Sequence, residues 1–411
     1  MDLHIVSEIP GTIIKTLVIC GLLMAPIDAD AGLSLKRIDT KEVGFVQSSK
    51  TNRPPLLVLP NNYLLCEDLN VYEMKMDQWP CIRYGLWNSP KQQKGTVELF
   101  LLPKPNGNVC RVGYDRNSQK FVIDIWKVSE AEKTIKLIGK RQGYKVRYVE
   151  ATMLPDGRIV TALNSQRRLK LHTWGILNKG GEAEVEALGF AQGGTMSIKE
   201  GLRVVALPKR DGKPDGVVTA VVTGGDLKVI FWEVRPDGKL LRRGNVRGGT
   251  LDHLTMTAIE KGEKRFVVTA VRTGGDLSLS VWGISDSGQV ERISTARGGS
   301  MEHVPIEVTA RPNGDVLTIV KRSDWRFWET GGPLAMIAWK ISSEGSITRG
   351  GSCVVPQATV KMIGKSEPAK GTEFYPGEAV FISDERMIWS SAIIDNENKR
   401  RNWISLWDVK N

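Results

Sequence analysis

The chain of 411 residues carries a formal net charge of +11, with 57 Lys and Arg against 46 Asp and Glu. Its 41% of apolar and 25% of charged residues are typical of an ordinary soluble protein and exclude an intrinsically disordered chain. No long stretch places apolar residues three and four positions apart, whereas short alternating runs between Gly, Pro, Asn and Asp are frequent. We therefore expect an all-β protein.

The first 31 residues have the pattern of a secretory signal peptide. Lys15 precedes the apolar run TLVICGLLMA, and Ala29-Asp30-Ala31 forms a small-x-small cleavage pattern. The run is too short to span a bilayer as a helix, so we expect no transmembrane segment. We predict cleavage near Ala31 and a secreted or periplasmic protein with a single domain at residues 32–411.

Cleavage would remove four acidic residues and one basic residue, which raises the formal net charge from +11 to +14. Outside the cytoplasm, a basic surface favours anionic partners such as acidic polysaccharide, lipid headgroups or nucleic acid. The alternative is that the charge only keeps the protein soluble.

The cysteines allow disulfides but do not require them. Cys20 lies in the apolar run, and the bulky Ile19 before it disfavours a lipid anchor there. The mature chain keeps an even number of cysteines, namely Cys66, Cys81, Cys110 and Cys353. Cys66 and Cys81 are the closest pair in the sequence, and two buried free thiols are an equally good interpretation. Since there is no CxxC motif, we expect no structural zinc site.

An internal repeat organises the mature chain. The segment VVTAVVTGGDLKVIFWEV at 217–234 returns fifty positions later as VVTAVRTGGDLSLSVWGI at 267–284. The second copy belongs to a unit of four predicted strands at 254–259, 266–273, 277–284 and 289–299. Four-stranded units repeated in this way predict a β-propeller.

Two markers count the units. The turn between the first two strands occurs seven times, near residues 60, 105, 155, 213, 261, 312 and 384. The third strand carries a tryptophan in six units, at Trp126, Trp174, Trp232, Trp282, Trp339 and Trp407. We therefore expect seven blades, with six as the fallback, because residues 55–95 align poorly with the other units. The segment GLSLKRIDT at 32–40 resembles the fourth strands and would close the last blade.

The units resemble WD repeats, in which a His, a hydroxyl residue, an Asp and a Trp bond one another within a blade. His253, Thr269, Asp276 and Trp282 stand in this order, and Thr219, Asp226 and Trp232 repeat part of it. The resemblance implies a propeller and a structural tetrad of His253, Thr269, Asp276 and Trp282. It does not imply a particular activity.

Several conspicuous residues have structural explanations. The tryptophan strands are apolar on both faces, as in a blade packed between two others, so we expect these rings in the core. The tetrad accounts for His253, so the pairs Asp252-His253 and Glu302-His303 are not expected to hold a metal. The Gly-Gly-Asp turns are hairpin turns, because no helix follows them. We expect no cofactor.

Basic residues gather on the predicted fourth strands, at Lys36, Arg37, Arg242, Arg243 and Arg292 and in RGG segments at 247–249, 297–299 and 349–351. Charge on an exposed edge strand prevents aggregation. The same charge could bind an anionic polymer along the rim.

Insertions mark the candidate site. They lie at 321–332, 352–376 and 395–401, and in a propeller all three emerge on one face. The candidate ligand-binding residues are Arg322, Trp325, Arg326, Phe327, Trp328, Lys399, Arg400 and Arg401. Aromatic rings beside guanidinium groups suit a sugar or an anionic ligand. A structural cap over the channel is the alternative.

We favour a non-catalytic binding or scaffolding module for a protein or an anionic or glycan ligand, and we do not expect nucleic acid. The alternative is a glycan hydrolase or lyase at the channel mouth, which requires two carboxylates about 5 to 10 Å apart. Four acids are candidates for that role: Asp324, Glu329, Asp384 and Asp395. No sequence motif supports a quinone-dependent dehydrogenase.

Overall fold

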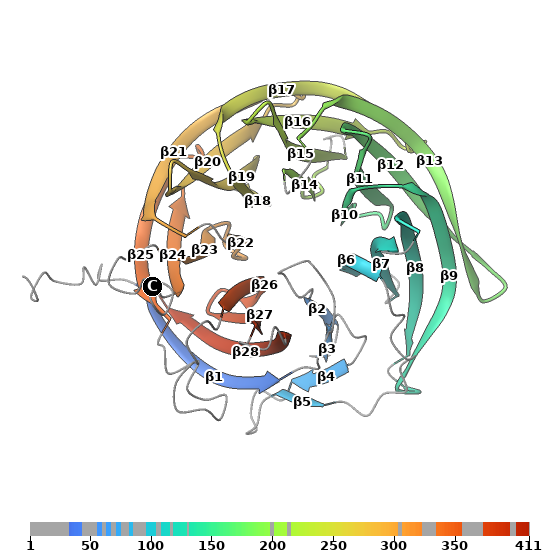
Figure 1. The fold of residues 1–411 in the computed structure, drawn as a ribbon, viewed down its shortest axis with the longest axis horizontal. Coiled ribbons are helices and arrows are strands. Elements are labelled where there is room, and N and C mark those ends of the chain that lie inside the picture. The colour runs from blue at the N-terminus through green and yellow to red at the C-terminus, as the bar shows by residue number, and fades with distance from the viewer. Residues whose placement is uncertain are drawn as a thin grey trace, which may run out of the picture. The chain divides into compact units, whose positions relative to one another are not determined.

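The protein divides into two units, residues 1–31 and 32–411. The computed structural model describes only parts of the second unit, namely residues 33–42, 56–59, 63–66, 71–74, 82–84, 96–103, 108–115, 118–129, 131–197, 201–211, 215–302, 306–322, 334–355, 373–394 and 400–410. In this part of the chain every regular element is a β-strand (Figure 1).

The strands of the first half are β1 (Ser34–Glu42), β2 (Leu56–Leu59), β3 (Tyr63–Cys66), β4 (Val71–Met74), β5 (Ile82–Tyr84), β6 (Thr96–Pro103), β7 (Val109–Asp115), β8 (Lys120–Ser129), β9 (Thr134–Lys145), β10 (Tyr148–Met153), β11 (Ile159–Ser165), β12 (Arg168–Lys179) and β13 (Glu182–Thr195). Those of the second half are β14 (Leu202–Ala206), β15 (Gly216–Thr223), β16 (Asp226–Val234), β17 (Leu240–Thr250), β18 (His253–Lys261), β19 (Lys264–Thr273), β20 (Asp276–Ile284), β21 (Val290–Ser300), β22 (Glu307–Ala310), β23 (Val316–Lys321), β24 (Leu334–Ile341), β25 (Ile347–Val354), β26 (Glu373–Ser383), β27 (Arg386–Ile394) and β28 (Arg400–Lys410).

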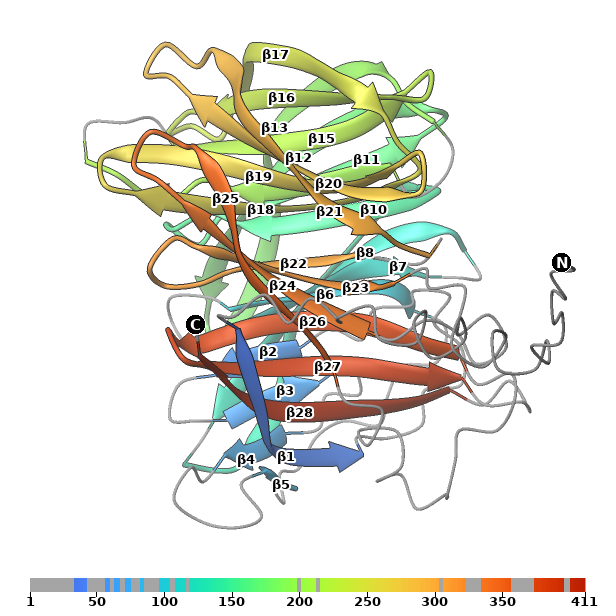
Figure 2. The same ribbon diagram turned by 90° about the vertical axis from the view of Figure 1, so that its left-hand side faces the viewer.

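These strands form seven four-stranded antiparallel sheets. Six sheets follow the chain, from β2–β5 to β22–β25, and the seventh has the order β1-β28-β27-β26. The sheets surround a central axis (Figures 1 and 2). In the six sheets that follow the chain the first strand is innermost and the fourth outermost, and in the seventh β26 is innermost and β1 outermost. The expected all-β propeller of four-stranded blades is therefore confirmed.

The sheets correspond to the units traced in the sequence, including the poorly aligned first one, which forms β2–β5. The N-terminal strand closes the circle as expected. In β1, Ser34 pairs with Lys410 and Arg37 pairs with Trp407. Each predicted tryptophan lies on the third strand of its sheet.

The tight turns explain the repeated glycine pairs. Gly224 and Gly225 join β15 to β16 at φ values of 61° and 91°, and Gly274 and Gly275 repeat this between β19 and β20. Two consecutive residues at positive φ are what a two-residue type I′ hairpin requires. In the sheet of β10–β13 the same turn is built from Gln166 and Arg167, both at positive φ, where glycine would be less strained.

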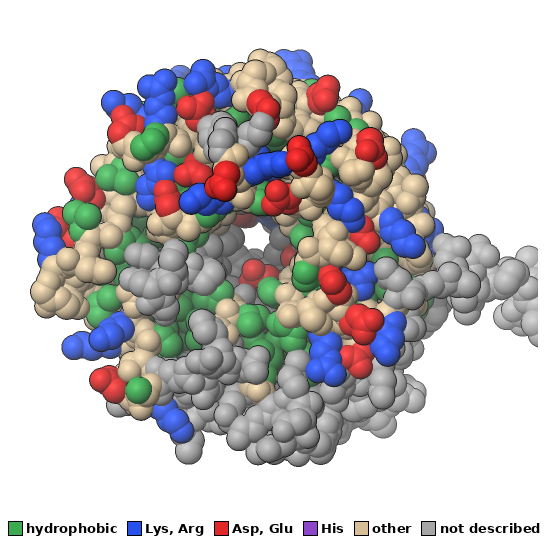
Figure 3. All heavy atoms as spheres, turned by 180° about the vertical axis from the view of Figure 1, so that it is seen from behind, with side chains coloured by type: hydrophobic (Ala, Val, Ile, Leu, Met, Phe, Trp, Pro, Cys, Tyr) green, Lys and Arg blue, Asp and Glu red, His purple; other side chains and the backbone are tan. Residues whose placement is uncertain are grey.

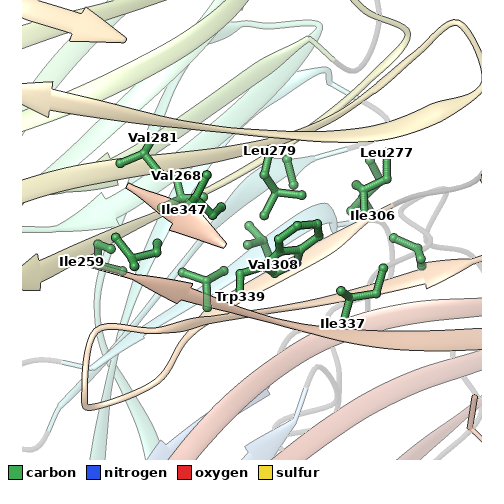
Figure 4. Close-up of a cluster of buried hydrophobic side chains, with 14 of the residues drawn as sticks. Ile259, Val268, Leu277, Leu279, Val281, Ile306, Val308, Ile337, Trp339 and Ile347 are labelled. Atoms are coloured by element: carbon green, nitrogen blue, oxygen red, sulfur yellow. The ribbon is translucent and has the colours of Figure 1, made fainter. Parts of the chain in front are cut away.

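The core lies between neighbouring sheets. One cluster joins β18–β21 to β22–β25, with Leu279 and Val281 of one sheet against Val308, Ile337 and Trp339 of the next (Figure 4). Both faces of each of these sheets are therefore buried, as expected from the apolar side chains on both faces of the tryptophan strands. Among the residues that the structure describes, none forms a helix long and apolar enough to cross a membrane.

Candidate ligand site in the central channel

The structure allows the inner strands to be aligned position by position. In four sheets a threonine on the second strand pairs with a residue of the first strand. We call the first-strand residue immediately before that partner the channel position of the sheet. The channel position is occupied by Glu150, Arg203, Thr255 and Glu307 in four consecutive sheets. Polar side chains thus recur at one level of the innermost strands, between apolar neighbours.

Three of these sheets contribute to one cluster. The Nη1 of Arg203 donates hydrogen bonds to Glu150 Oε1 at 2.8 Å and to Tyr148 Oη at 2.7 Å, and the Tyr148 hydroxyl donates to Glu150 Oε1 at 2.7 Å. Glu307, two sheets further on, also acts electrostatically on Arg203. We call Tyr148, Glu150, Arg203 and Glu307 the channel cluster.

Electrostatics keep Arg203 charged in this buried place. Burial alone would lower the pKa of Arg203, but Tyr148, Glu150 and Glu307 together raise it above its ordinary value. Glu150 and Glu307 are only 6% and 7% exposed. Groups of the fourth and sixth sheets of the chain can influence each other in this way only across the central axis.

Arg203 also has an unused donor. Its Nε is buried and has no hydrogen-bond partner among the described residues. Buried polar groups are nearly always satisfied, so an orphaned guanidinium donor indicates a place for a bound water or a ligand. Figure 3 shows the opening through the middle of the molecule, with acidic side chains beside it.

The cluster lies towards one face of the propeller. The channel residues occupy the first three positions of β10, β14, β18 and β22, near the ends where the chain enters each inner strand. The turns between second and third strands leave from the same face, because all sheets have the same strand order. The described ends that flank the predicted insertions, Lys321, Leu334, Val354, Glu373, Ile394 and Arg400, are strand ends on this face.

Most predicted ligand-binding residues lie outside the described part of the chain. These are Trp325, Arg326, Phe327, Trp328 and Lys399, and for Arg400 and Arg401 only the backbone, in β28, is described. Arg322 is described: it is exposed and forms an isolated β-bridge with Met301. The insertion site therefore stays a prediction.

Most of the candidate catalytic acids also lie outside the described part of the chain. Asp324, Glu329 and Asp395 lie outside the described residues. Asp384 lies in the turn between β26 and β27, where its Oδ1 accepts a hydrogen bond from the backbone N–H of Asn313 at 3.0 Å. That turn joins a first strand to a second strand, so it is on the face opposite the insertions. Asp384 holds two sheets together there and does not belong to the channel mouth.

The tetrad residues are partly brought together. Trp282 donates a hydrogen bond to Thr269 at 2.9 Å, and His253 is buried nearby at the start of β18. Asp276 accepts a hydrogen bond from Ser300 at 3.2 Å. Asp252, considered as a metal ligand, forms an ion pair with Arg272. Within the described ranges, no group of three or more His, Cys, Asp or Glu side chains could hold a metal ion.

The two cysteines whose side chains the structure describes, Cys110 and Cys353, form no disulfide. Cys353 is a free, half-buried thiol, and burial raises its pKa to about 12, which makes it unreactive. Cys110 is buried in the core. Cys81 and the side chain of Cys66 lie outside the described residues, so their pairing stays a prediction.

The sequence patterns do not identify the channel cluster. No constant spacing marks these residues, because Glu150, Arg203 and Glu307 precede the tryptophans of their units by 24, 29 and 32 positions, and only the strand pairing shows that they are equivalent. Glu150 and Arg203 are 53 residues apart in the chain and meet because consecutive sheets pack against each other, whereas Glu307 acts on Arg203 from two sheets further on.

No protein-family model matches the chain, WD-repeat or other, and no curated protein matches it at a significant level. The chain resembles solved structures. A protein of unknown function from Dyadobacter fermentans is 10% identical, with a TM-score of 0.45 over 91% of this chain and 99% of that one. An alpha-L-arabinanase from Penicillium chrysogenum is 15% identical, with a TM-score of 0.41 over 76% and 93%.

An exo-beta-1,3-galactanase from Phanerochaete chrysosporium is 9% identical, with a TM-score of 0.38 over 78% of this chain and 62% of that one. The assignment to the β-propeller architecture rests on the sheet topology of this chain.

Proposed function

We propose that this protein is a binding module that holds a carbohydrate at the mouth of its central channel. The observation that carries the proposal is the largely buried guanidinium of Arg203, around which two other sheets place polar groups and whose Nε has no partner among the described residues. An unsatisfied donor beside two carboxylates marks a place where the hydroxyl group of a ligand would gain a hydrogen bond.

The chemistry of the cluster suits hydroxyl groups. Glu150 and Glu307 are acceptors, Arg203 is a donor, and the hydroxyls of Tyr148 and Thr255 can act as either. Two carboxylates against one guanidinium leave this part of the channel acidic. A neutral or amino sugar therefore fits the mouth better than an anionic one, and any acidic polysaccharide would bind elsewhere on the protein.

The predicted insertion residues would complete this site. The strand ends that flank them lie on the face towards which the channel cluster is placed. Trp325, Phe327 and Trp328 could supply flat apolar surfaces on which a sugar ring stacks, while the channel cluster binds its hydroxyls.

Binding of a panel of neutral, amino and acidic oligosaccharides to residues 32–411 tests the proposal. We expect neutral or amino sugars to bind, and Glu307→Gln to weaken them by about tenfold, since hydrogen bonds to charged groups contribute about 1.5 to 3 kcal/mol. The matched control is Glu260→Gln, which removes an exposed carboxylate near the other end of an inner strand. Binding that Glu307→Gln and Trp325→Ala/Trp328→Ala leave unchanged would contradict the site.

Hydrolysis of the bound glycan is the second candidate, because Glu150 and Glu307 come from different sheets and act on the same guanidinium. Glu150 accepts bonds from Arg203 and Tyr148 and so would be the ionised base that takes a proton from water. Glu307 would then be the acid that protonates the leaving glycosidic oxygen. Release of reducing sugar that Glu307→Gln abolishes, while binding is weakened only by about tenfold, would favour the enzyme. Binding without release would favour the module.

We also propose export from the cytoplasm, on the evidence of the pattern at residues 1–31. Production in an exporting host should give a mature chain whose mass corresponds to cleavage near Ala31. A mass that retains residues 1–31 would contradict this.

A further inference from the structure

Four outer strands carry arginine at one equivalent position. Opposite the third-strand tryptophan, the fourth strand places Arg242 against Trp232, Arg292 against Trp282, and Arg349 against Trp339. In the closing strand β1, Arg37 stands opposite Trp407. We call Arg37, Arg242, Arg292 and Arg349 the rim arginines.

The rim arginines belong to consecutive blades. Their strands β17, β21, β25 and β1 follow one another along the outer edge of the domain (Figures 1 and 2). In the two preceding sheets the same position is Ala187 and Leu137. Arginine opposite the tryptophan is therefore found in consecutive blades along one sector of the rim, whereas the exposed cations of β9 (Lys136, Lys140, Arg141 and Lys145) lie at other positions. Arg247, Arg297 and Arg349 each begin an RGG segment, but only Arg349 lies opposite a tryptophan. Arg247 pairs with Lys228 and Arg297 pairs with Ser278.

The sheet of β14–β17 carries two further cations, Lys228 and Arg247, beside Arg242. Lys228 of β16 pairs with Arg247 of β17. Because Lys228 precedes Trp232 by four residues, it lies on the same face of the sheet as Trp232 and Arg242. Burial, followed by the nearby charges of Arg242 and Arg247, lowers the pKa of Lys228. Three cations thus meet on one face of this sheet. In the next sheet Ser278 pairs with Arg297 in the same way.

In the described part of the chain, a subset of these cations on β16, β17 and β21 forms no ion pair with an acidic side chain. No ion pair involves Lys228, Arg242, Arg247, Arg292 or Arg297 there, whereas inner cations are paired: Arg158 with Asp156 and Asp215, and Lys261 with Asp315. On the opposite face of β17, Arg243 is also paired, with Glu233. Like charges on neighbouring strands destabilise a sheet, so the cluster of Lys228, Arg242 and Arg247 costs stability unless an anion binds to it.

Protection of edge strands does not account for this arrangement. A single charge anywhere on an outer strand prevents edge-to-edge pairing. Packing of the guanidinium on the opposite tryptophan explains the register of Arg292, which lies 5.9 Å from the centroid of the Trp282 ring. Neither edge protection nor this packing requires Lys228 beside two arginines.

We propose that the rim arginines bind a sulfated or carboxylated polysaccharide chain that lies across consecutive blades, with Lys228, Arg242 and Arg247 as the strongest subsite. Guanidinium groups bind planar or tetrahedral oxyanions through paired hydrogen bonds. The site is distinct from the channel mouth, whose carboxylates would repel such a chain.

A polysaccharide fits this sector better than nucleic acid. Single-stranded nucleic acid binds on exposed aromatic rings between basic side chains. Among the described residues the exposed large apolar side chains are Leu177, Phe190 and Val354, and no exposed aromatic ring lies on β17, β21 or β25. The tryptophans opposite the arginines are buried.

The test measures binding of a heparin-derived sulfated octasaccharide and of polygalacturonate oligomers at several salt concentrations. Arg242→Gln/Arg247→Gln should weaken binding by about tenfold and lower the slope of log affinity against log salt by roughly two, since each lost contact releases about one counterion fewer. The control Arg235→Gln/Arg243→Gln removes the same charge from the residues beside Glu233 and should leave both values unchanged.

Circular dichroism and thermal unfolding establish that each variant is folded. Equal losses in both double variants would mean that only net charge matters, and the proposal would be wrong. Unchanged binding in Arg242→Gln/Arg247→Gln would contradict it too. Tighter binding of single-stranded DNA than of either glycan, lost in the same variant, would assign the sector to nucleic acid. Glu307→Gln should not affect this binding, which separates it from the channel proposal.

Discussion

The indole Nε1 of Trp282 donates a hydrogen bond of 2.9 Å to the hydroxyl oxygen of Thr269, and both side chains are buried. The same bond joins the third-strand tryptophan to a second-strand threonine in three further sheets, as Trp174–Thr161, Trp232–Thr219 and Trp339–Thr318. The threonine satisfies the one polar atom of a large ring, which can then pack between sheets.

Removal of this acceptor should destabilise the domain. Thr219→Val keeps the shape of the side chain but leaves the Trp232 N–H buried without a partner, so we expect the free energy of unfolding to fall by about 1 to 3 kcal/mol. Urea denaturation followed by tryptophan fluorescence measures this. Thr250→Val, at an exposed position, is the control and should change it by less than about 0.5 kcal/mol. Equal stability of the two variants would show that the bond contributes nothing.

Much of the fold could be predicted because each unit repeats the same local signals. The turns, the third-strand tryptophans and the closing strand were all marked by residues within a few positions of one another. The exceptions could not be predicted in this way. The threonine position is occupied by Arg111 in the sheet of β6–β9 and by Trp389 in the closing sheet, which the register reveals.

The candidate site was harder to predict for a physical reason. The channel cluster joins Glu150, Arg203 and Glu307 from three sheets, and only the packing of the sheets around the axis brings them together. The rim arginines were visible as basic outer strands, but their common register needed the strand pairing, because the bulge in each fourth strand shifts the alignment. The insertions with Trp325 and Trp328 stay predictions.

Arg111 occupies the threonine position in the sheet of β6–β9, and we predict a large coupling energy between Arg111 and Asp124. Arg111 and Asp124 form a fully buried ion pair of 2.6 Å, and the guanidinium lies 5.5 Å from the centroid of the Trp126 ring. Arg111→Thr alone would leave Asp124 buried without its cation, and we expect a loss of about 3 to 5 kcal/mol.

The double variant Arg111→Thr/Asp124→Ile copies the residues Thr219 and Ile230 of another sheet. It should recover most of the loss, since Trp126 Nε1, which has no partner among the described residues, would gain an acceptor. Denaturant unfolding of the single and double variants gives the coupling. Additive losses would contradict the equivalence of these positions.

His172 predicts a pH dependence of stability. Burial and then the charge of Lys170 lower its pKa to about 4, and its Nε2 lies 2.5 Å from the Tyr144 hydroxyl, whose pKa burial raises to about 12. The neutral imidazole therefore accepts a hydrogen bond from the phenolic O–H of Tyr144. Because the folded pKa lies below the unfolded value of about 6.5, the unfolded chain binds more protons.

Stability should accordingly be lost as the pH falls from about 6.5 to about 4, and below that the loss from this residue should be complete. We expect 1 to 2 kcal/mol, less than the roughly 3 kcal/mol of the full shift, because solvent reaches part of the ring. His172→Gln retains an acceptor but does not titrate. Its unfolding free energy should depend less on pH over this range, and an unchanged dependence would refute the assignment.

The closing strand predicts how truncation affects the fold. Residues 1–31 form a separate unit, so a chain that begins at residue 32 should unfold at the same temperature as the full chain. A chain that begins at residue 43 lacks β1, which pairs with β28 from Ser34 to Glu42. The backbone groups of β28 on that side would then be unpaired, and we expect a lower melting temperature or aggregation. A synthetic peptide of residues 32–42 should bind to the shorter chain and restore its melting temperature, because it supplies the same strand without a covalent link. A 43–411 chain as stable as 32–411, or one that the peptide does not stabilise, would mean that β1 does not close the ring in solution.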